Sequence, residues 1–334
     1  MRIITILDTA TGSLNKGDEI IMESARRGLE PVVGHDFHIN IPSHLAAFPP
    51  MQSRGSGRVN AVTNSELKFA CGTDMFWTNM WWKRNPCYNI NMYNYRPFVN
   101  TIFMGVGYSD KDFTEDMNWY TKTLWKKVLS SKYVHSTRDE KTKELIEKNL
   151  GFEAINTGCP TLWGFTPEFC AEIPSAKAPE VVTTVSNHTN VEEDEAMLAL
   201  LKSEYDQVYL WLQGIKDMEY IKTLKNAQGI KLIAPELKNY REFLQTHDVD
   251  FVGPRLHAGV FAMQNKRRAI ILSVDHRASD FADVFDLPVI PRGDIDTWGQ
   301  IMVKGHATEI KMNFDNINKW RNQFIDPNAD SVAF

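Results

Sequence analysis

The most informative segment of this chain reads Phe251-Val-Gly-Pro254-Arg255-Leu256-His257-Ala-Gly-Val-Phe-Ala262. Its apolar start predicts a buried strand, Gly253-Pro254 predicts a tight turn, and the small and apolar residues that follow predict a helix. Residues 269–274 are then almost unbroken apolar, which is typical of a strand covered on both faces. Strand, helix and strand in this order predict a parallel βαβ unit.

The same alternation extends along the rest of the chain. We expect further strands at 2–7, 36–41, 101–106, 132–135, 152–156, 181–185, 208–212 and 231–234, and helices at 18–29, 139–149, 192–203, 217–225, 240–245 and 313–324. Residues 151–179 hold four prolines and little periodicity, so neither element continues well there. The sequence therefore predicts an α/β protein with an N-terminal domain (1–175), a C-terminal domain (176–305) and a C-terminal segment (306–334) whose helix packs back on the first domain.

Composition limits the class of protein. The 334 residues are 43% hydrophobic and 24% charged, as in ordinary globular proteins, and the net charge of −5 offers no basic field for a nucleic acid. The apolar run before Asp8 is too short for a signal peptide, and no run approaches the length of a membrane span. The four cysteines include no C-x-x-C pair, so we expect reduced thiols. We expect a soluble cytoplasmic protein that contacts a membrane at most peripherally.

A polar loop joins the first strand to the first helix: Asp8-Thr-Ala-Thr-Gly-Ser-Leu-Asn15-Lys-Gly17-Asp18-Glu19. Ligands of open α/β sheets bind at such loops, and the free N–H groups of a helix start favour an anion. The spacing is not G-x-G-x-x-G, so it indicates dinucleotide binding only weakly. The alternative, favoured by chemistry alone, makes Gly17 a turn glycine and Asp18 the N-cap of the helix.

A second polar motif, Ser136-Thr-Arg138-Asp139-Glu140, lies where a strand gives way to a helix. Ser136 with Asp139 resembles a capping box with a shorter acid. Arg138 has no such explanation, because a cation is unfavourable at the positive end of a helix dipole unless an anion is near. Two interpretations stay open: Arg138 binds a ligand phosphate or carboxylate, or it pairs with a neighbouring carboxylate.

Ionisable residues also follow two strands of the second domain. The guanidinium of Arg255 can hold a carboxylate or phosphate in two-pronged fashion, and His257 can exchange protons near neutral pH. Ser273-Val-Asp275-His276-Arg277 places further charges after the next strand, where a solvated loop is the alternative. Because ligands bind at the carboxyl ends of parallel strands, these residues predict a site there.

Aromatic residues gather between Phe76 and Phe98 among asparagines. Their rings can stack on a sugar, or they can pack in a core or an oligomer contact. Packing is the favoured interpretation, because large aromatic side chains are most often buried.

Four motifs together resemble the polysaccharide pyruvyltransferase family. An early Asn-x-Gly-Asp is met by Asn15-Lys-Gly17-Asp18, and a Cys/Asp-Pro segment by Gly158-Cys159-Pro160-Thr-Leu162. The family's Arg-Asp pair is met by Arg138-Asp139, followed by Thr142 and Leu145, and its Arg-Leu-His by Arg255-Leu256-His257. Arg-Leu-His before a helix of small residues is the most specific of these, and the resemblance covers residue 1 to about residue 300.

The resemblance implies a fold similar to that of GT-B glycosyltransferases, with two Rossmann-like domains facing across a cleft. The N-terminal domain would be the acceptor side and the C-terminal domain the donor side. It implies phosphoenolpyruvate as donor and two hydroxyls of one sugar as acceptors, which close a cyclic pyruvate ketal. The sugar would belong to a surface glycan such as a capsule or exopolysaccharide, or to its lipid-linked precursor. It implies no further cofactor and no metal, and it leaves an oligomer possible.

The resemblance also implies roles for individual residues. Arg138 and Arg255 would bind the anionic groups of the donor and His257 would act as general acid and base. Arg277 would be a third cation for the donor, and Asp18 and Asp139 would be bases or acceptor contacts. Asn15, Gly17 and Leu256 would make further substrate contacts.

Two departures from the family pattern bear on this expectation. Phe69-Ala70-Cys71-Gly72 replaces a glycine triplet, so side chains can narrow the approach of a ligand to the backbone there. Val185-Ser186-Asn187-His188 stands where members often have an arginine, which indicates a different substrate contact. The alternative functions are a nucleotide-sugar glycosyltransferase of the same build and a non-catalytic subunit of polysaccharide assembly.

Overall fold

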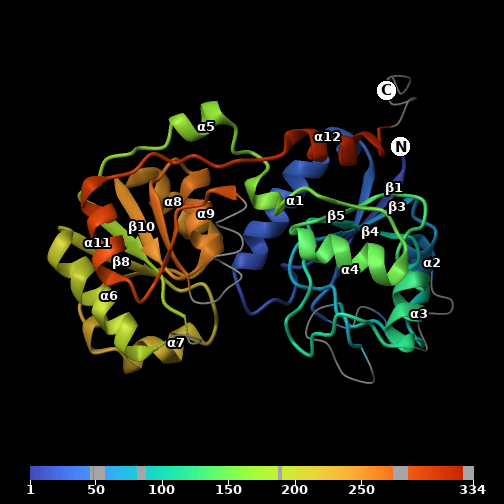
Figure 1. The fold of residues 1–334 in the computed structure, drawn as a ribbon, viewed down its shortest axis with the longest axis horizontal. Coiled ribbons are helices and arrows are strands. Elements are labelled where there is room, and N and C mark those ends of the chain that lie inside the picture. The colour runs from blue at the N-terminus through green and yellow to red at the C-terminus, as the bar shows by residue number, and fades with distance from the viewer. Residues whose placement is uncertain (46–47, 49–56, 81–87, 187–189, 274–284, 326–334) are drawn as a thin grey trace. The chain divides into compact units, whose positions relative to one another are not determined.

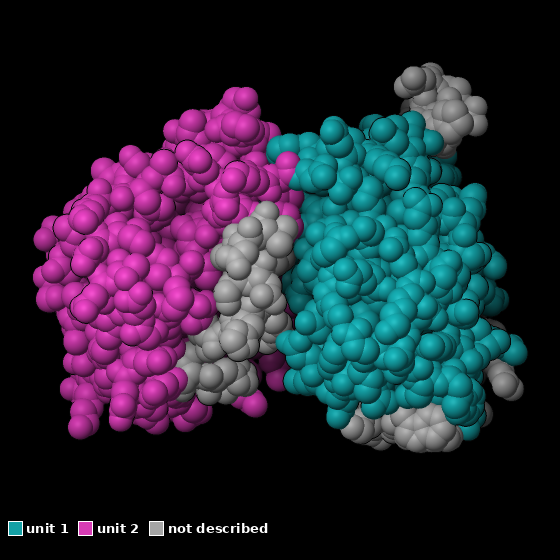
Figure 2. Space-filling view, in the orientation of Figure 1, with its two compact units in different colours: residues 1–13, 21–163, 313–334 teal, residues 14–20, 164–312 magenta. Residues whose placement is uncertain are grey.

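The computed structural model describes residues 1–45, 48, 57–80, 88–186, 190–273 and 285–325 (Figure 1). The chain divides into two compact units, coloured separately in Figure 2. Unit 1 comprises Met1–Ser13, Ile21–Trp163 and Asn313–Phe334, and unit 2 comprises Leu14–Ile20 and Gly164–Met312. Each unit has its own parallel sheet.

The sheet of unit 1 is built from short parallel strands. Four of them pair in the order β2-β1-β3-β4: β1 (Ile3–Asp8), β2 (Phe37–Pro42), β3 (Leu67–Cys71) and β4 (Thr101–Met104). A separate two-stranded parallel sheet, β5 (His135–Thr137) and β6 (Ala154–Asn156), continues the four strands past β4 through an isolated bridge between Val106 and Thr137. The extension is held by the Arg138 N–H, which donates to Val106 O at 3.1 Å, and by the Gly105 N–H, which donates to Ser136 Oγ at 2.7 Å.

Helices and aromatic side chains form the core of unit 1. The helices include α1 (Gly17–Val33), α2 (Gly57–Thr63), α3 (Trp119–Val128), α4 (Glu140–Leu150) and α12 (Phe314–Asn322). Trp125 of α3 packs against Phe76, Tyr88 and Phe103 at centroid distances of 5.3, 5.8 and 5.6 Å. The packing interpretation of the aromatic segment is thus confirmed for these residues, whereas Tyr93 is exposed and Trp81 and Trp82 lie outside the described residues.

Unit 2 has a six-stranded parallel sheet in the order β9-β8-β7-β10-β11-β12. Numbered from β7 this is 3-2-1-4-5-6, the doubly wound Rossmann order. The strands are β7 (Glu180–Thr183), β8 (Gln207–Trp211), β9 (Lys231–Ile233), β10 (Val249–Gly253), β11 (Ala269–Ser273) and β12 (Val289–Pro291).

Helices cover both faces of this sheet. Neighbouring residues of a strand point to opposite faces. Leu210 belongs to the core formed with α6 (Val191–Glu204) and α11 (Ile295–Lys304). Trp211 stacks instead on Tyr240 of α8 (Leu237–Thr246) at 4.2 Å, and Tyr240 lies 5.7 Å from Phe261 of α9 (Leu256–Gln264).

The structure differs from the sequence expectations in several elements. The helix expected over 217–225 is only α7 (Asp217–Tyr220), followed by two 3-10 turns. Residues 164–175, with α5 (Pro167–Ala171), cluster with unit 2 rather than unit 1, because Glu172 pairs with Lys266 and the Phe169 ring packs under the same ammonium group. α12, in contrast, lies with the unit that the sequence predicted: it clusters with unit 1, and the centroid of the Trp320 ring is 5.9 Å from that of Phe69. Among the described helices none is both long and apolar enough to span a membrane.

Candidate active site

The site in unit 2 forms where the strand order reverses. β7 and β10 are neighbours in the sheet, and the chain leaves their carboxyl ends toward opposite sides, which is where ligands bind in doubly wound sheets. Arg255 lies at this point as the N-cap of α9. Its N–H donates to Thr184 Oγ1 at 3.3 Å and its Nε donates to Val185 O at 3.2 Å, so the two strand ends hold it between them.

A buried carboxylate fixes the guanidinium of Arg255. Nη2 donates to both oxygens of Asp217, at 2.5 and 2.7 Å, and the Asp217 side chain is fully buried whereas that of Arg255 is 16% exposed. Asp217 Oδ2 also accepts from the Gly214 N–H at 2.9 Å. A Cβ on Gly214 would lie 2.9 Å from Nη2, so a side chain at this position would collide with the Arg255–Asp217 pair. Arg255 is therefore a held cation at a strand end.

His257 lies in the first turn of α9, two residues after Arg255, and is half-buried. Leu256 begins the helix and is half-buried too. The rest of α9 is buried, and a Cβ on Gly259 would meet Ile271 Cγ1 at 2.6 Å, so a small residue lets the helix lie close to β11. This packing presents the helix N-terminus, Arg255 and His257 together at the sheet edge.

The Asn15 motif joins this site, because Leu14–Ile20 belongs to unit 2. Asn15 Oδ1 accepts from the Gly17 N–H at 3.0 Å and from Gln213 Nε2 at 2.8 Å, and the Lys16 N–H donates to Gln213 O at 2.8 Å. The interpretation of Asp18 as the N-cap is wrong. α1 begins at Gly17, so Asp18 lies inside its first turn, where it is buried, and the Asn15 side chain forms the turn before the helix.

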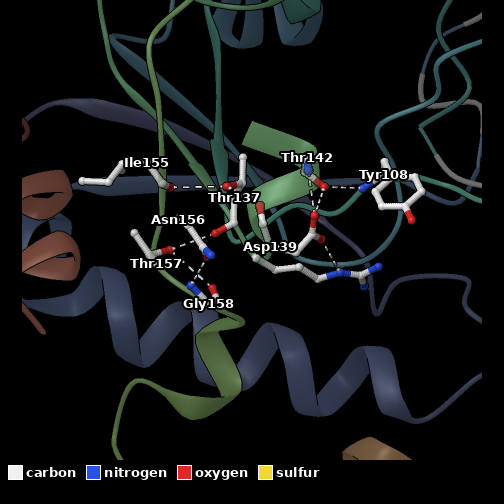
Figure 3. Close-up of polar contacts among 9 residues, drawn as sticks. Tyr108, Thr137, Asp139, Thr142, Ile155, Asn156, Thr157 and Gly158 are labelled. Atoms are coloured by element: carbon white, nitrogen blue, oxygen red, sulfur yellow. Dashed lines mark hydrogen bonds and ion pairs between the residues drawn. The ribbon is translucent and has the colours of Figure 1, made fainter. Parts of the chain in front are cut away.

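The Arg138 motif lies in unit 1 at the carboxyl end of β5 (Figure 3). Asp139, and not Ser136, is the N-cap of α4: its Oδ1 accepts from the N–H and the hydroxyl of Thr142, both at 2.7 Å. The capping-box interpretation is wrong because Ser136 is inside the strand and bonds Thr157 instead, at 2.6 Å. Arg138 thus precedes the helix, and its Nε lies 3.4 Å from Asp139 Oδ2, so the expected ion pair is present.

Gly107 gives Arg138 its position. A Cβ on Gly107 would lie 2.1 Å from Arg138 Nε and 2.4 Å from Cζ, so the guanidinium rests directly against this glycine. The Tyr108 N–H donates to Thr142 Oγ1 at 2.9 Å, which ties the same loop to the start of α4 (Figure 3). The end of β4 and the start of α4 together hold Arg138 and Asp139.

The structure thus gathers the predicted residues into two groups. Asn15, Gly17, Arg255, Leu256 and His257 share unit 2 with Asp18, and Arg138 and Asp139 share unit 1; Arg277 lies outside the described residues. The convergence of Arg138 and Arg255 on one ligand stays a prediction. In the described ranges, no group of three or more His, Cys, Asp and Glu side chains is arranged to hold a metal ion.

Comparison with known proteins places this arrangement in a family. The model of the family described as polysaccharide pyruvyl transferase matches residues 15–276, a span that begins at Asn15 and includes both arginine motifs. The chain belongs to the polysaccharide pyruvyl transferase family. This pyruvyl transferase family match makes the chain an enzyme of that class, with a glycan as the acceptor class. No curated protein matches the sequence.

Solved structures show which fold this family member has. The UDP-GlcNAc 2-epimerase of Methanocaldococcus jannaschii, solved with UDP-GlcNAc and UDP, is similar with a TM-score of 0.52 at 12% identity, over 97% of this chain and 98% of that one. S. aureus MnaA, solved with UDP, has a TM-score of 0.44 at 11% identity, over 98% and 88% of the two chains. At such identity the epimerase shows the fold alone, a GT-B-like pair of Rossmann-like units.

Proposed function

We propose that this enzyme transfers pyruvate from phosphoenolpyruvate to two hydroxyls of one sugar residue of a glycan, forming a cyclic ketal and releasing phosphate. The observation that carries the proposal is the family match across a span that holds Arg255 and His257 on one helix start. Phosphoenolpyruvate is a compact anion with a carboxylate and a phosphate on one carbon. Such a donor needs fixed cations and a group that exchanges protons beside it.

Arg255 and α9 supply the anion-binding part of this requirement. The free N–H groups of a helix N-terminus attract an anion, and a guanidinium held by a neighbouring carboxylate loses little freedom on binding one. Asp217 accepts from Nη2 and Val185 O accepts from Nε, so Nη1 is the group proposed to bind the donor. Arg255 would therefore contact the carboxylate or the phosphate with one edge while Asp217 holds the other.

His257 is proposed as the general acid and base. Protonation of the methylene carbon of phosphoenolpyruvate makes it a methyl group and leaves the neighbouring carbon electrophilic. One sugar hydroxyl adds there, the carbon–oxygen bond to phosphate breaks, and the second hydroxyl closes the ring. Of the two hydroxyl protons, one balances the new methyl C–H bond and the other leaves with phosphate. An imidazole in the first turn of α9 can relay these protons near neutral pH.

Substitution of His257 tests this role. We expect His257→Gln to lower phosphate release about 10²-fold or more, while the melting temperature and its rise on adding phosphoenolpyruvate stay close to those of the unsubstituted protein. The matched control is His35→Gln, because His35 is exposed and lies in unit 1. A stable His257→Gln protein with normal turnover would require another acid.

A further inference from the structure

Two buried hydroxyls in unit 1 have no hydrogen-bond partner. Thr9 follows the last residue of β1 and is 0% exposed, and Thr73 lies two residues after β3 and is 6% exposed. Neither Oγ1 makes a hydrogen bond. Buried hydroxyls in native proteins are normally paired, so two orphans at neighbouring strand ends call for an explanation.

The two threonines lie where the strand order of unit 1 reverses. β1 and β3 are parallel neighbours, with Leu7 paired to Ala70, and β2 lies on the other side of β1. The carboxyl ends of β1 and β3 therefore border the crevice position of this sheet. This is the place in unit 1 that corresponds to Arg255 in unit 2.

The backbone at Thr73 adopts a conformation that its side chain disfavours. Thr73 has φ +56° directly after Gly72 at φ +65°. A β-branched residue is rarely found at positive φ, and such strain gathers at functional sites. Glycine would relieve the strain but would lack the hydroxyl. Ala70 and Cys71, which precede Gly72, lie buried in β3.

Polar groups that can recognise hydroxyls adjoin the two threonines, because Asp8 precedes Thr9 and Asp74 follows Thr73 in the chain. Asp8 Oδ1 accepts from the N–H groups of Ala10 and Thr11 at 2.8 and 3.2 Å, and Asp8 Oδ2 accepts from Arg26 at 2.6 Å. The Ser43 N–H donates to Asp8 O at 2.9 Å, which places His44 beside Asp8. Burial lowers the pKa of His44, although the charges of Asp74 and Asp8 act in the opposite sense. The imidazole of His44 and the carboxyl groups of Asp8 and Asp74 thus lie close enough to interact.

This crevice adjoins the Arg138 site. The Gly107 N–H donates to Thr73 O at 2.8 Å, and Gly107 is the residue against which the Arg138 guanidinium rests. A ligand at the ends of β1 and β3 would therefore be one strand away from the end of β4 and from Arg138.

We propose that the crevice at Asp8, Thr9, His44, Thr73 and Asp74 binds hydroxyl groups of the acceptor sugar. This inference rests on the proposed function and adds the acceptor contacts to it. A sugar hydroxyl both donates and accepts, so it can pair with a threonine hydroxyl and a carboxylate together. An anion fits less well, because Asp8 and Asp74 are negative and Arg26 is already paired with Asp8.

The two hydroxyls can be removed without changing the shape of the side chains. We expect Thr9→Val and Thr73→Val each to raise the acceptor concentration at half-saturation about fivefold or more, with the phosphoenolpyruvate-induced thermal shift unchanged. The melting temperature should stay the same or rise, because an unpaired buried hydroxyl gives way to an apolar group. The acceptors are 4-nitrophenyl glycosides of glucose, galactose, mannose and N-acetylglucosamine, and phosphate release is measured.

Thr308→Val is the matched control, because Thr308 Oγ1 is a buried, unpaired hydroxyl of unit 2. It should leave acceptor saturation unchanged. Unchanged acceptor saturation in both Thr9→Val and Thr73→Val, with normal phosphate release, would overturn the inference and leave the proposed function standing. If phosphoenolpyruvate releases no phosphate at all, the proposed function fails, and saturation-transfer NMR with the same glycosides then decides the inference. A weaker saturation-transfer signal of the glycosides in the two valine variants than in the unsubstituted protein supports the inference, and an equal signal overturns it.

Discussion

Among single residues, Asp217 holds the guanidinium of Arg255, the cation proposed to bind the donor. Asp217→Asn keeps the shape of the side chain but leaves Arg255 without its buried counter-charge. We expect the free energy of unfolding to fall by about 3 kcal/mol, and the phosphoenolpyruvate concentration at half-saturation to rise about tenfold or more, because the guanidinium loses its orientation. Chemical denaturation and donor saturation curves measure the two effects.

The control for this substitution is Asp248→Asn in the same unit. The Asp248 side chain is 72% exposed and lies 3.9 Å from Arg267, so its loss should change stability by less than about 0.5 kcal/mol. Tighter donor binding by Asp217→Asn would mean that Asp217 competes with the donor for Arg255 instead of positioning it.

Gly107 allows a matching test of Arg138. Gly107→Ala places a methyl group where the guanidinium now rests, so we expect Arg138 to move and phosphate release to fall about tenfold or more, with little change in melting temperature. Gly164→Ala is the control, since a Cβ there meets no atom within 4 Å. Equal turnover of both variants would show that the position of Arg138 is unimportant.

The place of Arg255 and His257 at a strand-to-helix junction could be predicted from the sequence, whereas the residues that hold Arg255 and Asn15 could not. Arg255 and His257 stand in one short motif, so the strand-to-helix pattern was enough to place them at a sheet edge. Asp217 resembled an ordinary first-turn acid of a helix, and its partner is 38 residues away. The bond from Gln213 to Asn15 spans 198 residues. Such contacts arise only when the loops of a sheet edge meet, and no local pattern signals them.

Of the elements, β5 carries a group that should make stability depend on pH. The buried His135 ring accepts from the Phe103 N–H at Nδ1 (3.2 Å), and its Nε2 lies 2.9 Å from Ser130 O, an arrangement that suits the neutral ring. Burial lowers the pKa of His135 to about 4. The unfolded chain therefore binds the proton first as the pH falls.

The resulting pH dependence has a definite sign. Because the folded pKa lies below the ordinary value, the stabilising contribution is complete above about pH 6.5 and is lost as the pH falls toward about 4, at up to about 1.4 kcal/mol per pH unit. Urea denaturation across this range measures it. His135→Gln should flatten the slope and the exposed His35→Gln should not; equal slopes in the two variants would assign the effect to other groups.

Helices and strands were easiest to predict where the run or period of apolar residues was unbroken along the element. The apolar run of β11 and the strand-to-helix pattern of β10 and α9 gave the positions of these elements, because β10, residues 269–272 of β11 and residues 258–263 of α9 are buried. α7 ends at Tyr220, earlier than the pattern of 217–225 predicted. That local pattern also gave no sign that Asp217 pairs with Arg255. β12 and α11 were not expected at all, and the short β12 has no fully buried residue to mark it.

For the whole molecule, the order of the strands explains why functional residues from distant parts of the sequence meet. Unit 2 takes in Leu14–Ile20, so the Asn15 loop lies with residues of the second half of the chain, and α12 completes unit 1. The alternation of strands and helices predicted two parallel α/β units. A periodic pattern does not show, however, that Leu14–Ile20 clusters with unit 2.

Product analysis tests the central claim most directly. The full chain is incubated with phosphoenolpyruvate and the glycoside panel, and phosphate release and the mass of each sugar are followed together. We expect one phosphate to be released for each sugar that gains a cyclic pyruvate ketal, with the ketal carbon visible by NMR and Arg255→Ala inactive. Phosphate release without a modified sugar, or transfer from a nucleotide sugar and none from phosphoenolpyruvate, would contradict it.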